Sequence, residues 1–349
     1  MDQTPQRPRL HTETQRFSMK KLFWIGSPFF SGSLAECGWE VCAHNFEHTA
    51  VFGWGDIVSI AGWEPDVVVV ADKSRPPFVL GMEKFPCLTV FYCVDSHIHS
   101  WYPLYAQGFD ACLMSLKDHM PRMAGDFLPA ERIWWFPAFA KNDDLPLPLP
   151  HTPEWDLLFV GTVNPQTTPK RHAFLQALKE RVPSLHVTQG NYRQLYPKAR
   201  LVLNFCEFGD LNFRVFEALG CGVCLVTPDI ANGQPELFTN GEDLLTYPVH
   251  TEDSMDRLVA TIEDALQDNG RCRRIAASGL AKVDSKHRAR HRAQAFTDAV
   301  RALSAEETIK KRMHRASAIR SGALRLIYLL LAESVESSLL KQAYLRAAG

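Results

Sequence analysis

Two runs of apolar segments that alternate with helix-forming segments constrain the fold of this chain more than any other feature. In the first run, the segments between the helical stretches are short and rich in Val, Ile and Phe. They cover residues 21–25, 39–46, 66–71, 87–94, 110–116 and 132–136. Continuous apolar strands separated by helices are typical of a parallel sheet with helices on both faces. The first part of the chain is therefore predicted to be a doubly wound α/β domain.

A proline-rich stretch, "AKNDDLPLPLPHTPEW" at 140–155, interrupts this pattern. Proline lacks a backbone donor and restricts the preceding residue to extended geometry, so the stretch is predicted to be a semi-rigid linker. The alternation then starts again. Strands are expected at 156–161, 185–189, 200–205, 223–227 and 243–248. We predict a second doubly wound, Rossmann-like parallel-sheet domain, with ligands bound in the crevice between the two domains.

The predicted organisation has five parts. We expect a disordered leader, an N-terminal domain, a proline-rich linker, a C-terminal domain and a set of terminal helices. Their bounds are 1–18, 19–140, 141–153, 154–285 and 286–349. A helix is expected to open near Thr251 and to run to about Asp268, because acidic residues follow Thr251. The basic segment before "LRLIYLLLA" predicts a final helical tail that packs on the protein or a partner, or touches an anionic membrane surface.

Composition excludes several classes of protein. The 38 Lys and Arg residues nearly cancel the 39 Asp and Glu residues, so no overall field favours nucleic acid. The polar first eighteen residues lack the apolar core of a secretory signal, and "LRLIYLLLA" is short of the roughly 20 residues that span a bilayer. The nine scattered cysteines, including Cys221 and Cys224, favour reduced, buried thiols over a metal site. We therefore expect a cytoplasmic protein.

The candidate ligand site follows from Arg214 and Glu217. The chain has neither a G-x-G-x-x-G nor a P-loop motif, which disfavours a dehydrogenase or a P-loop nucleotidase. Arg214 and Glu217 lie three residues apart in the opening turns of a predicted helix, whose free N–H groups attract anions. Arg214 is suited to grip a diphosphate, and Glu217 to accept from ribose hydroxyls. The alternative is an ordinary intrahelical ion pair.

A family resemblance supports the ligand-binding interpretation. The segments "LNFRVFEALGCGVCLVTPD" and "PELFTNGEDLLTYPVHTEDSMDRL" resemble the donor-binding half of GT-B glycosyltransferases, most closely the CgeB-like spore-maturation group. "CVDSHIHSWYPLYAQGFDACLMSLKDHMPRM" resembles the acceptor-side domain of that group, and the similarity extends from about Lys20 to Leu303. The resemblance implies that Arg214 meets the donor diphosphate and Glu217 the ribose. Asp210 and Asn212 would shape the loop beside the donor sugar.

The resemblance carries two further expectations. Many retaining GT-B enzymes have a second Glu eight residues before the helix Glu, where this chain has Gly209; Glu207 is near but out of register. The inverting or retaining outcome is therefore left open. The segment "KVDSKHRARHRAQAFTDAVRAL", at 282–303, is expected to be the long helix that in GT-B folds crosses back onto the first domain, with its charges on a solvated face.

A second set of phosphate contacts is expected where the second sheet begins. Gly161 follows the first predicted strand of that sheet, and Lys170 and Arg171 open the next helix. Gly161 allows close approach of the backbone to a ligand. Fixed cations at Lys170 or Arg171 would stabilise the charge that grows on a departing diphosphate, without a metal. The alternative for both side chains is ordinary solvation.

The catalytic candidates come from "DSHIH". Asp95, His97 and His99 follow an apolar strand at alternating positions, so an extended backbone would send all three to one side. Asp95 is our first candidate for the base that activates an acceptor hydroxyl, and His97 the second. His99 is as well explained by a capping or lining role. Metal binding by these residues is disfavoured because no Asp-x-Asp of the metal-dependent glycosyltransferase type occurs.

The sequence thus predicts a metal-independent glycosyltransferase. It would move a sugar from a nucleotide-diphosphate sugar to the hydroxyl of a carbohydrate or other acceptor, with no cofactor besides the donor and no nucleic acid as partner. One alternative is a nucleotide-sugar epimerase of the same architecture. The other is a non-catalytic nucleotide-sugar-binding or scaffold protein.

Overall fold

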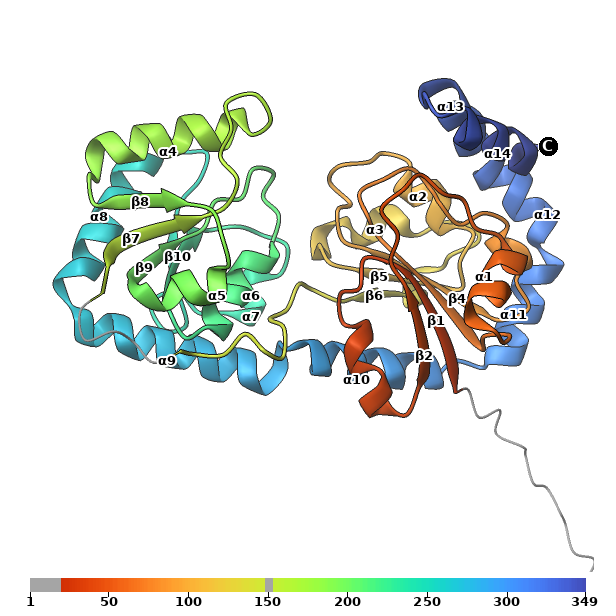
Figure 1. The fold of residues 1–349 in the computed structure, drawn as a ribbon, viewed down its shortest axis with the longest axis horizontal. Helices are drawn as coiled ribbons and strands as arrows, with labels where there is room; N and C mark the ends of the chain where they lie inside the picture. The colour runs from red at the N-terminus through yellow and green to blue at the C-terminus, as the bar shows by residue number, and fades with distance from the viewer. Residues whose placement is uncertain (1–19, 148–152) are drawn as a thin grey trace, which may run out of the picture.

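The computed structural model describes residues 20–147 and 153–349, which form two parallel sheets with helices around them (Figure 1). The expected leader over 1–18 and part of the expected linker lie outside the described residues. Every strand pair in both sheets is parallel. The predicted fold class, two doubly wound α/β domains, is therefore confirmed.

The first sheet contains six strands in the order β2-β1-β3-β4-β5-β6. Their bounds are β1 Lys21–Gly26, β2 Glu40–His44, β3 Val67–Ala71, β4 Leu88–Cys93, β5 Ala111–Met114 and β6 Ile133–Trp135. Successive residues of a strand point to opposite faces, so Phe23 and Ile25 enter one core while Leu22 and Trp24 enter the other. Burial on both faces explains why these strands are continuously apolar.

Helices cover both faces of the first sheet. On one face lie α1 (Trp54–Ala61), α2 (Tyr102–Ala106) and α3 (Met120–Met123), together with helices from the end of the chain. On the other face lie the 3-10 turns over 31–37 and α10 (Ala289–Arg301). The first domain is therefore completed by segments more than 150 residues away from it in the sequence.

The second sheet contains five strands in the order β11-β10-β9-β7-β8. Their bounds are β7 Trp155–Val160, β8 Leu185–Thr188, β9 Ala199–Leu203, β10 Cys224–Pro228 and β11 Leu245–Tyr247. One face is covered by α4 (Pro169–Arg181) and α8 (Ser254–Gln267), the other by α5 (Tyr192–Leu195) and α6 (Phe213–Gly220), and α9 (Asn269–Lys286) contributes to both cores.

Helix α8 begins later than predicted. We expected Thr251 to cap it, but the helix opens at Ser254. The Ser254 hydroxyl donates to the Thr251 carbonyl at 2.7 Å, and the Thr251 amide lies 3.0 Å from the same hydroxyl oxygen. These local bonds hold residues 251–254 as a turn, because Ser and Thr side chains compete with helical hydrogen bonds.

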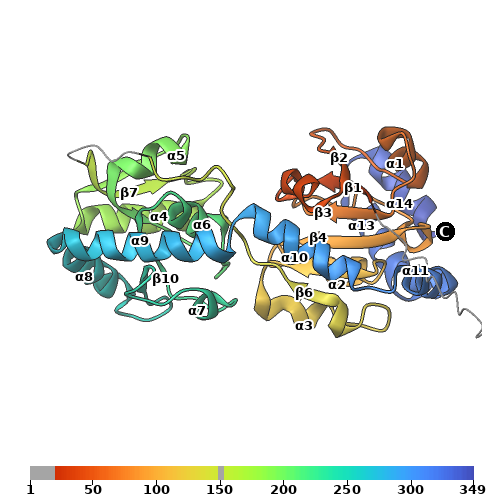
Figure 2. The ribbon, with the colours of Figure 1, turned by 90° about the horizontal axis from the view of Figure 1, so that it is seen from below.

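The chain crosses between the domains twice, and the two crossings pair with each other (Figure 2). The first crossing follows β6, and the second lies between α9 and α10. The Ala140 amide donates to the His287 carbonyl at 2.9 Å, and the Ala289 amide donates to the Ala140 carbonyl at 2.9 Å. The single helix expected over 282–303 is therefore wrong: the backbone around His287 bonds to the first crossing instead of continuing the helix.

Two arginines expected on a solvated face are buried at this junction. Arg288 is 1% exposed and donates to the carbonyls of Lys141 and Asp144, both at 2.8 Å. Arg292 is 7% exposed and donates to the Pro137 and Ala138 carbonyls at 2.9 and 3.1 Å. Burial lowers the pKa of Arg292 to about 10. The expectation of solvated charges is thus wrong for both residues, because they satisfy carbonyls of the first crossing.

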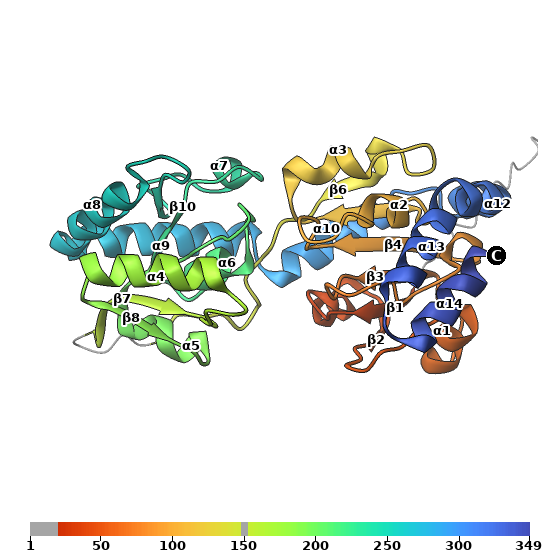
Figure 3. The same cartoon turned by 90° about the horizontal axis from the view of Figure 1, so that it is seen from above.

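The end of the chain packs on the first domain (Figure 3). It forms α11 (Ala305–His314), α12 (Ala316–Ile319), a π-helical turn (Arg320–Leu324), α13 (Arg325–Ser334) and α14 (Ser338–Ala348). Tyr328 and Tyr344 are buried in the core of that domain, and the Tyr344 hydroxyl donates to the Pro77 carbonyl at 2.8 Å. Among the described residues, no helix is both long enough and apolar enough to span a bilayer.

Candidate functional site

Loops at the carboxyl ends of the two sheets meet between the domains. Phe29, after β1, stacks on Phe213, the first residue of α6, with ring centroids 5.7 Å apart. The ring of His97, which follows β4, lies against the ring of Phe208 in the loop after β9, with ring centroids 5.4 Å apart. Open parallel sheets bind their ligands at the carboxyl ends of their strands. The candidate site is therefore built from both domains at once.

Arg214 is held by neutral groups at this edge of the second sheet. Its Nη1 donates to Asn204 Oδ1 at 2.9 Å, and its guanidinium lies 5.0 Å above the Phe159 ring. Asn204 is fully buried and is itself fixed by a 3.0 Å bond from its Nδ2 to Thr227 Oγ1. In the described ranges 20–147 and 153–349, Arg214 forms no ion pair, with Glu217 or any other carboxylate. The guanidinium is thus positioned while its charge stays available to an anion.

Gly161 makes room for this arrangement. A Cβ atom at Gly161 would lie 3.0 Å from Arg214 Nη2 and 3.2 Å from Phe159 Cε1. Contacts this short would force the guanidinium to move. Besides the backbone approach expected from the sequence, the glycine therefore lets Arg214 lie over Phe159.

Glu217 lies one helical turn after Arg214 and is partly buried. Burial raises the pKa of the Glu217 carboxyl, and the nearby Asp144 carboxylate raises it further, while the charge of Arg214 opposes both effects. Asp144 comes from the first crossing, is fully buried and accepts from the Tyr192 hydroxyl at 2.7 Å. Ionisation of Glu217, which the carboxylate needs in order to accept hydrogen bonds with both oxygens, therefore lowers the free energy of unfolding.

Glu217→Gln is expected to stabilise the unliganded protein at pH 7. A raised pKa means that the folded state binds the proton more tightly than the unfolded chain. The free energy of unfolding of the parent should therefore fall as the pH rises from 4.5, the ordinary value for Glu, through the raised pKa. The variant lacks this contribution. Urea denaturation of both proteins between pH 4.5 and 8 measures the difference, and a pH-independent difference would contradict the prediction.

Lys170 and Arg171 are the second and third residues of α4, and they differ in environment. Lys170 is exposed, with its Nζ 5.2 Å from the centre of the Phe208 ring. Arg171 is partly buried; its Nη1 donates to the Thr162 carbonyl at 2.9 Å, and its Nε lies 3.6 Å from Glu207 Oε1. Burial lowers the pKa of Arg171, Glu207 opposes this, and the nearby charge of Arg214 lowers the pKa further. Arg171 and Arg214 thus lie close enough to repel each other, as cations around an anion site do.

The loop between β9 and α6 carries Asp210 and Asn212. Asn212 precedes α6 but does not cap it with its side chain. Its Nδ2 instead lies 3.3 Å from Asn204 Oδ1, and its own Oδ1 is buried without a partner. Gly209 has a φ of +70°, in the left-handed region that favours glycine. The Glu207 carboxylate faces Arg171. Neither Gly209 nor Glu207 therefore places a second carboxylate beside Glu217.

The segment after β4 is a turn rather than an extended strand. The Ile98 amide donates to the Asp95 carbonyl at 2.8 Å. His97 lies against Phe208 with its Nδ1 buried and unpartnered, whereas the His99 ring lies 5.5 Å from Trp101. The extended backbone expected after β4 is therefore wrong, and with it the reason to place all three side chains on one side.

Asp95 lies in a polar cluster organised by Asp72, which sequence reasoning missed. Asp72 is 4% exposed and accepts from the amides of Ser74 and Asp95 at 2.8 and 2.9 Å and from the Tyr102 hydroxyl at 2.7 Å. The Ser74 hydroxyl donates to Asp95 Oδ2. Burial raises the pKa of Asp95; the Ser74 bond opposes this, and the charges of Asp72 and Asp210 add to it. The sequence contained a hint, since Asp72 directly follows the buried run "VVVVA".

Contacts between the domains hold the loop after β10 against the first domain. Asp118, after β5, accepts from the Asn232 amide at 3.0 Å, and the Asp118 amide lies 3.3 Å from Asn232 Oδ1. Asn232 Nδ2 in turn donates to the Gly209 carbonyl at 2.9 Å. Lys117 forms an ion pair with Glu236 beside these bonds. We refer to Lys117, Asp118, Asn232 and Glu236 as the interdomain latch.

Removing the latch is expected to open the two domains without unfolding them. Its hydrogen bonds and ion pair each contribute about 1 kcal/mol or less, so Lys117→Ala with Asp118→Ala should change the melting temperature little. The radius of gyration from small-angle X-ray scattering should rise. Arg122→Ala, an exposed cation on α3, serves as control. Identical scattering of the parent and the double variant would contradict a role of the latch in closure.

Comparisons with known proteins agree with this architecture. Residues 148–298 match the family described as "Glycosyl transferase-like". No curated protein is similar enough in sequence to count as a relative. Among solved structures, sucrose-phosphate synthase from Thermosynechococcus elongatus is 11% identical, with a TM-score of 0.53 over 81% of this chain and 98% of the other. HepE from Anabaena, solved in complex with UDP and glucose, is 13% identical, with a TM-score of 0.55 over 82% and 100%.

A glycosyltransferase from Rickettsia africae gives the same picture, at 7% identity and a TM-score of 0.55 over 84% of this chain and 100% of that one. At such identities the likeness concerns the fold, and the two doubly wound sheets described above are its basis. The chain therefore has the GT-B fold, and the part of it that carries Arg214 and Glu217 matches a glycosyl transferase-like family.

Proposed function

We propose that this chain is a glycosyltransferase that moves a sugar from a nucleotide-diphosphate sugar to an acceptor hydroxyl. The observation that carries the proposal is Arg214, which is fixed by Asn204 and Phe159 but has no carboxylate partner in the described part of the chain. A cation held by neutral groups at a helix N-terminus is suited to a diphosphate. Glu217 then accepts from the ribose hydroxyls.

The leaving diphosphate is stabilised by fixed cations in this proposal. Arg171 lies close to Arg214, and Lys170 lies beside Phe208 at the same edge. As the glycosidic bond breaks, negative charge grows on the diphosphate, and preorganised cations stabilise it without reorganisation. We therefore propose a metal-independent transfer with no cofactor besides the donor.

Asp95 is the proposed base, with His97 as the second candidate. Both lie in the first domain beside the loop that carries Phe208 and Asp210. A carboxyl with a raised pKa is a stronger base when ionised, and burial raises the pKa of Asp95, with smaller contributions from the charges of Asp72 and Asp210. The acceptor hydroxyl would then enter between the first domain and the bound donor.

Asp95→Asn is expected to lower kcat by roughly 100- to 10,000-fold while donor affinity stays unchanged. The amide keeps the shape of the side chain but cannot take a proton. In the parent, kcat should also fall on the acid side as Asp95 becomes protonated, at a pH above the ordinary range for Asp because its pKa is raised. Transfer rates and donor Kd for both proteins test this. Equal loss of kcat and donor affinity would instead assign Asp95 to donor binding.

Two finer assignments belong to the same proposal. The "LNFRVFEALGCG" segment supports placement within the CgeB-like group. All nine cysteines are free thiols, which supports a reducing compartment such as the cytoplasm.

Thermal stabilisation by nucleotides tests the proposed function. UDP, GDP, dTDP and CMP and their sugars are each added to the protein, with uridine nucleotides first because HepE was solved with UDP. A ligand of the folded state raises the melting temperature by mass action, by about 2.7 kcal/mol of stability at 100 times Kd. Release of the free nucleotide and glycosylated product then distinguishes a transferase from a binding protein. Stabilisation by none of the nucleotides would overturn the proposal.

A further inference from the structure

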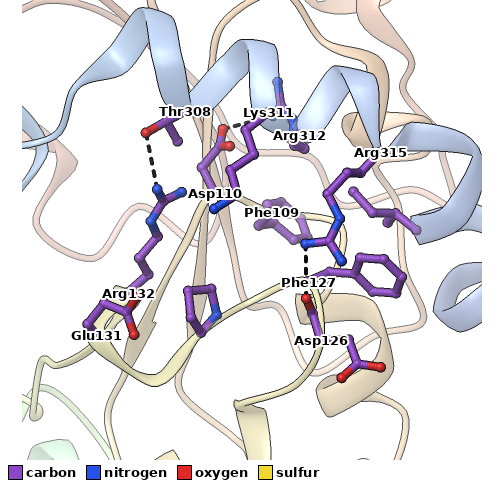
Figure 4. A pocket seen from close by; sticks show the side chains of 12 residues that line it. Phe109, Asp110, Asp126, Phe127, Glu131, Arg132, Thr308, Lys311, Arg312 and Arg315 are labelled. Carbon is purple, nitrogen blue, oxygen red and sulfur yellow. Dashed lines mark hydrogen bonds and ion pairs between the residues drawn. The ribbon is translucent and has the colours of Figure 1, made fainter.

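A small pocket lies at the opposite edge of the first sheet from the candidate site (Figure 4). Asp110 immediately precedes β5 and Arg132 immediately precedes β6, so the pocket lies at the amino ends of these strands. The candidate site lies at their carboxyl ends. Residues of α11 and α12 form the facing wall, and the cavity volume is about 170 Å³.

Three cations of this pocket have no carboxylate partner. Arg132 Nη2 lies 3.3 Å from Thr308 Oγ1, and Arg315 Nη1 donates to the Asp126 carbonyl at 3.1 Å. Lys311 is exposed, and in the view of Figure 4 its amino end lies between the two guanidinium groups. Within 20–147 and 153–349, none of the three takes part in an ion pair. Arg132, Lys311 and Arg315 are called the rear cations below.

The floor of the pocket contains a buried ion pair with unsatisfied atoms. Arg312 and Asp110 are 5% and 2% exposed, and Arg312 Nη1 lies 2.9 Å from Asp110 Oδ2. Asp110 Oδ1 and Arg312 Nε are buried without any hydrogen-bond partner. A buried donor and a buried acceptor left open at one pocket indicate a missing ligand or water. Since the pair itself is neutral, the net charge of the pocket is set by the residues around it.

The other carboxylates of the pocket are at its rim. Asp126 and Glu131 are both exposed, so water screens their charge. Figure 4 shows the Asp126 carboxylate on the far side of Phe127 from Lys311. The rear cations therefore face the cavity without direct compensation.

The size of the cavity limits its ligand. A volume of 170 Å³ is several times the roughly 30 Å³ that one water occupies. It is below the roughly 300 Å³ at which pockets for drug-sized ligands begin, so a nucleotide sugar does not fit. A single tetrahedral oxyanion does, and the guanidinium and ammonium groups around the cavity supply N–H donors for its oxygens.

We propose that the rear cations form a second, independent binding site for a phosphate-sized anion, such as inorganic phosphate or the phosphate group of a small metabolite. Arg132 lies directly before β6. Lys311 lies on α11, and Arg315 directly follows that helix. A bound phosphate therefore joins the edge of the sheet to the terminal helices. This site is distinct from the donor site by its position and by its ligand.

Phosphate binding is measured directly, because phosphate also stabilises proteins by exclusion from their surface. Isothermal titration with inorganic phosphate at constant ionic strength is compared for the parent, Lys311→Gln, Arg315→Gln and the control Lys310→Gln. Lys310 is the neighbouring lysine on α11 and pairs with Glu306 instead. We expect one site per chain in the parent and in the control. Each rear-cation variant should bind at least roughly tenfold more weakly.

The same titration separates this site from the donor site. With a saturating nucleotide present, or in Arg214→Ala, phosphate binding should persist. Binding that disappears under either condition would place the phosphate at the donor site and overturn the proposal. Non-saturable binding in the parent, or equal affinity in Lys311→Gln and Lys310→Gln, would overturn it as well. Failure of nucleotides to bind leaves this test valid, so the two proposals fail separately.

Discussion

Arg214→Ala is expected to weaken binding of the donor nucleotide by roughly 30- to 1,000-fold. Hydrogen bonds to charged groups contribute about 1.5–3 kcal/mol each, and a forked guanidinium makes two when it grips a phosphate. A loss of about 2–4 kcal/mol corresponds to that range of affinity. At 100 times the parent Kd, the stabilisation by the best nucleotide should therefore fall from about 2.7 kcal/mol to about 0.9 kcal/mol or less in the variant.

The unliganded variant provides the first control. Arg214 is held by a hydrogen bond to the neutral side chain of Asn204 and not by an ion pair within the described residues, so its removal should change the melting temperature in the absence of nucleotide only slightly. Arg273→Ala, an exposed arginine on α9, removes the same charge away from the site and should bind like the parent. Arg214→Lys keeps the charge but loses the fork, and intermediate affinity is expected. Parent-like binding by Arg214→Ala would mean that the arginine is not a donor ligand.

Asp110→Ala is expected to destabilise the protein by about 3–5 kcal/mol, the largest effect on stability among the changes considered. Asp110 Oδ2 accepts from Arg312 Nη1 at 2.9 Å and from the Thr89 amide at 2.9 Å. Removal of the carboxylate leaves the Arg312 charge buried without compensation, which is more unfavourable than the loss of the contact alone. Urea denaturation of the parent and the variant measures the change.

A double replacement tests the cause of that loss. With Arg312→Met added, no buried charge remains, so the double variant should recover part of the stability lost in Asp110→Ala. Asp126→Ala, at an exposed position, should stay within about 0.5 kcal/mol of the parent. If the double variant is less stable than Asp110→Ala, the buried unpaired charge is not the reason for the destabilisation.

The strands were predictable because a strand that is buried on both faces has a continuous run of apolar residues in the sequence. β3, with the sequence "VVVVA", is buried at every position and is apolar at every position. β4 is also buried at all six positions and is apolar at all of them except Thr89. Such runs can be recognised without knowing which strands pair, and the proline-rich stretch at 140–155 separates the two sets of strands in the sequence.

The two predictions that were wrong, a continuous helix over 282–303 and an extended segment after β4, failed because of contacts between residues that are far apart in the sequence. The break between α9 and α10 arises because His287 and Ala289 bond to Ala140, about 150 residues earlier. The turn after β4 forms where the amides of Val94 and Asp95 bond to Asp72 from the end of β3. Neither partner is visible in the local pattern of charges and apolar residues, which is compatible with a continued helix and a continued strand.

The same reasoning applies to the candidate site. The spacing of Arg214 and Glu217 placed both on α6 but left open whether they pair with each other. The answer came from Phe159 on β7 and from Asn204, which directly follows the neighbouring strand β9; both contact the guanidinium at the edge of the sheet. Asp144, which modulates Glu217, comes from the first crossing and has no recognisable motif.

The paired crossings have a mechanical consequence. Two chain segments that are hydrogen-bonded side by side, at Ala140 with His287 and Ala289, resist sliding and twisting, because either motion breaks those bonds and the contacts of Arg288 and Arg292. Bending across the pair breaks none of them, and hinges of this kind absorb domain motion at a few residues. We therefore expect the domains to open and close mainly by bending at this pair of crossings. In that case a single spin-label distance across the two domains follows the transition.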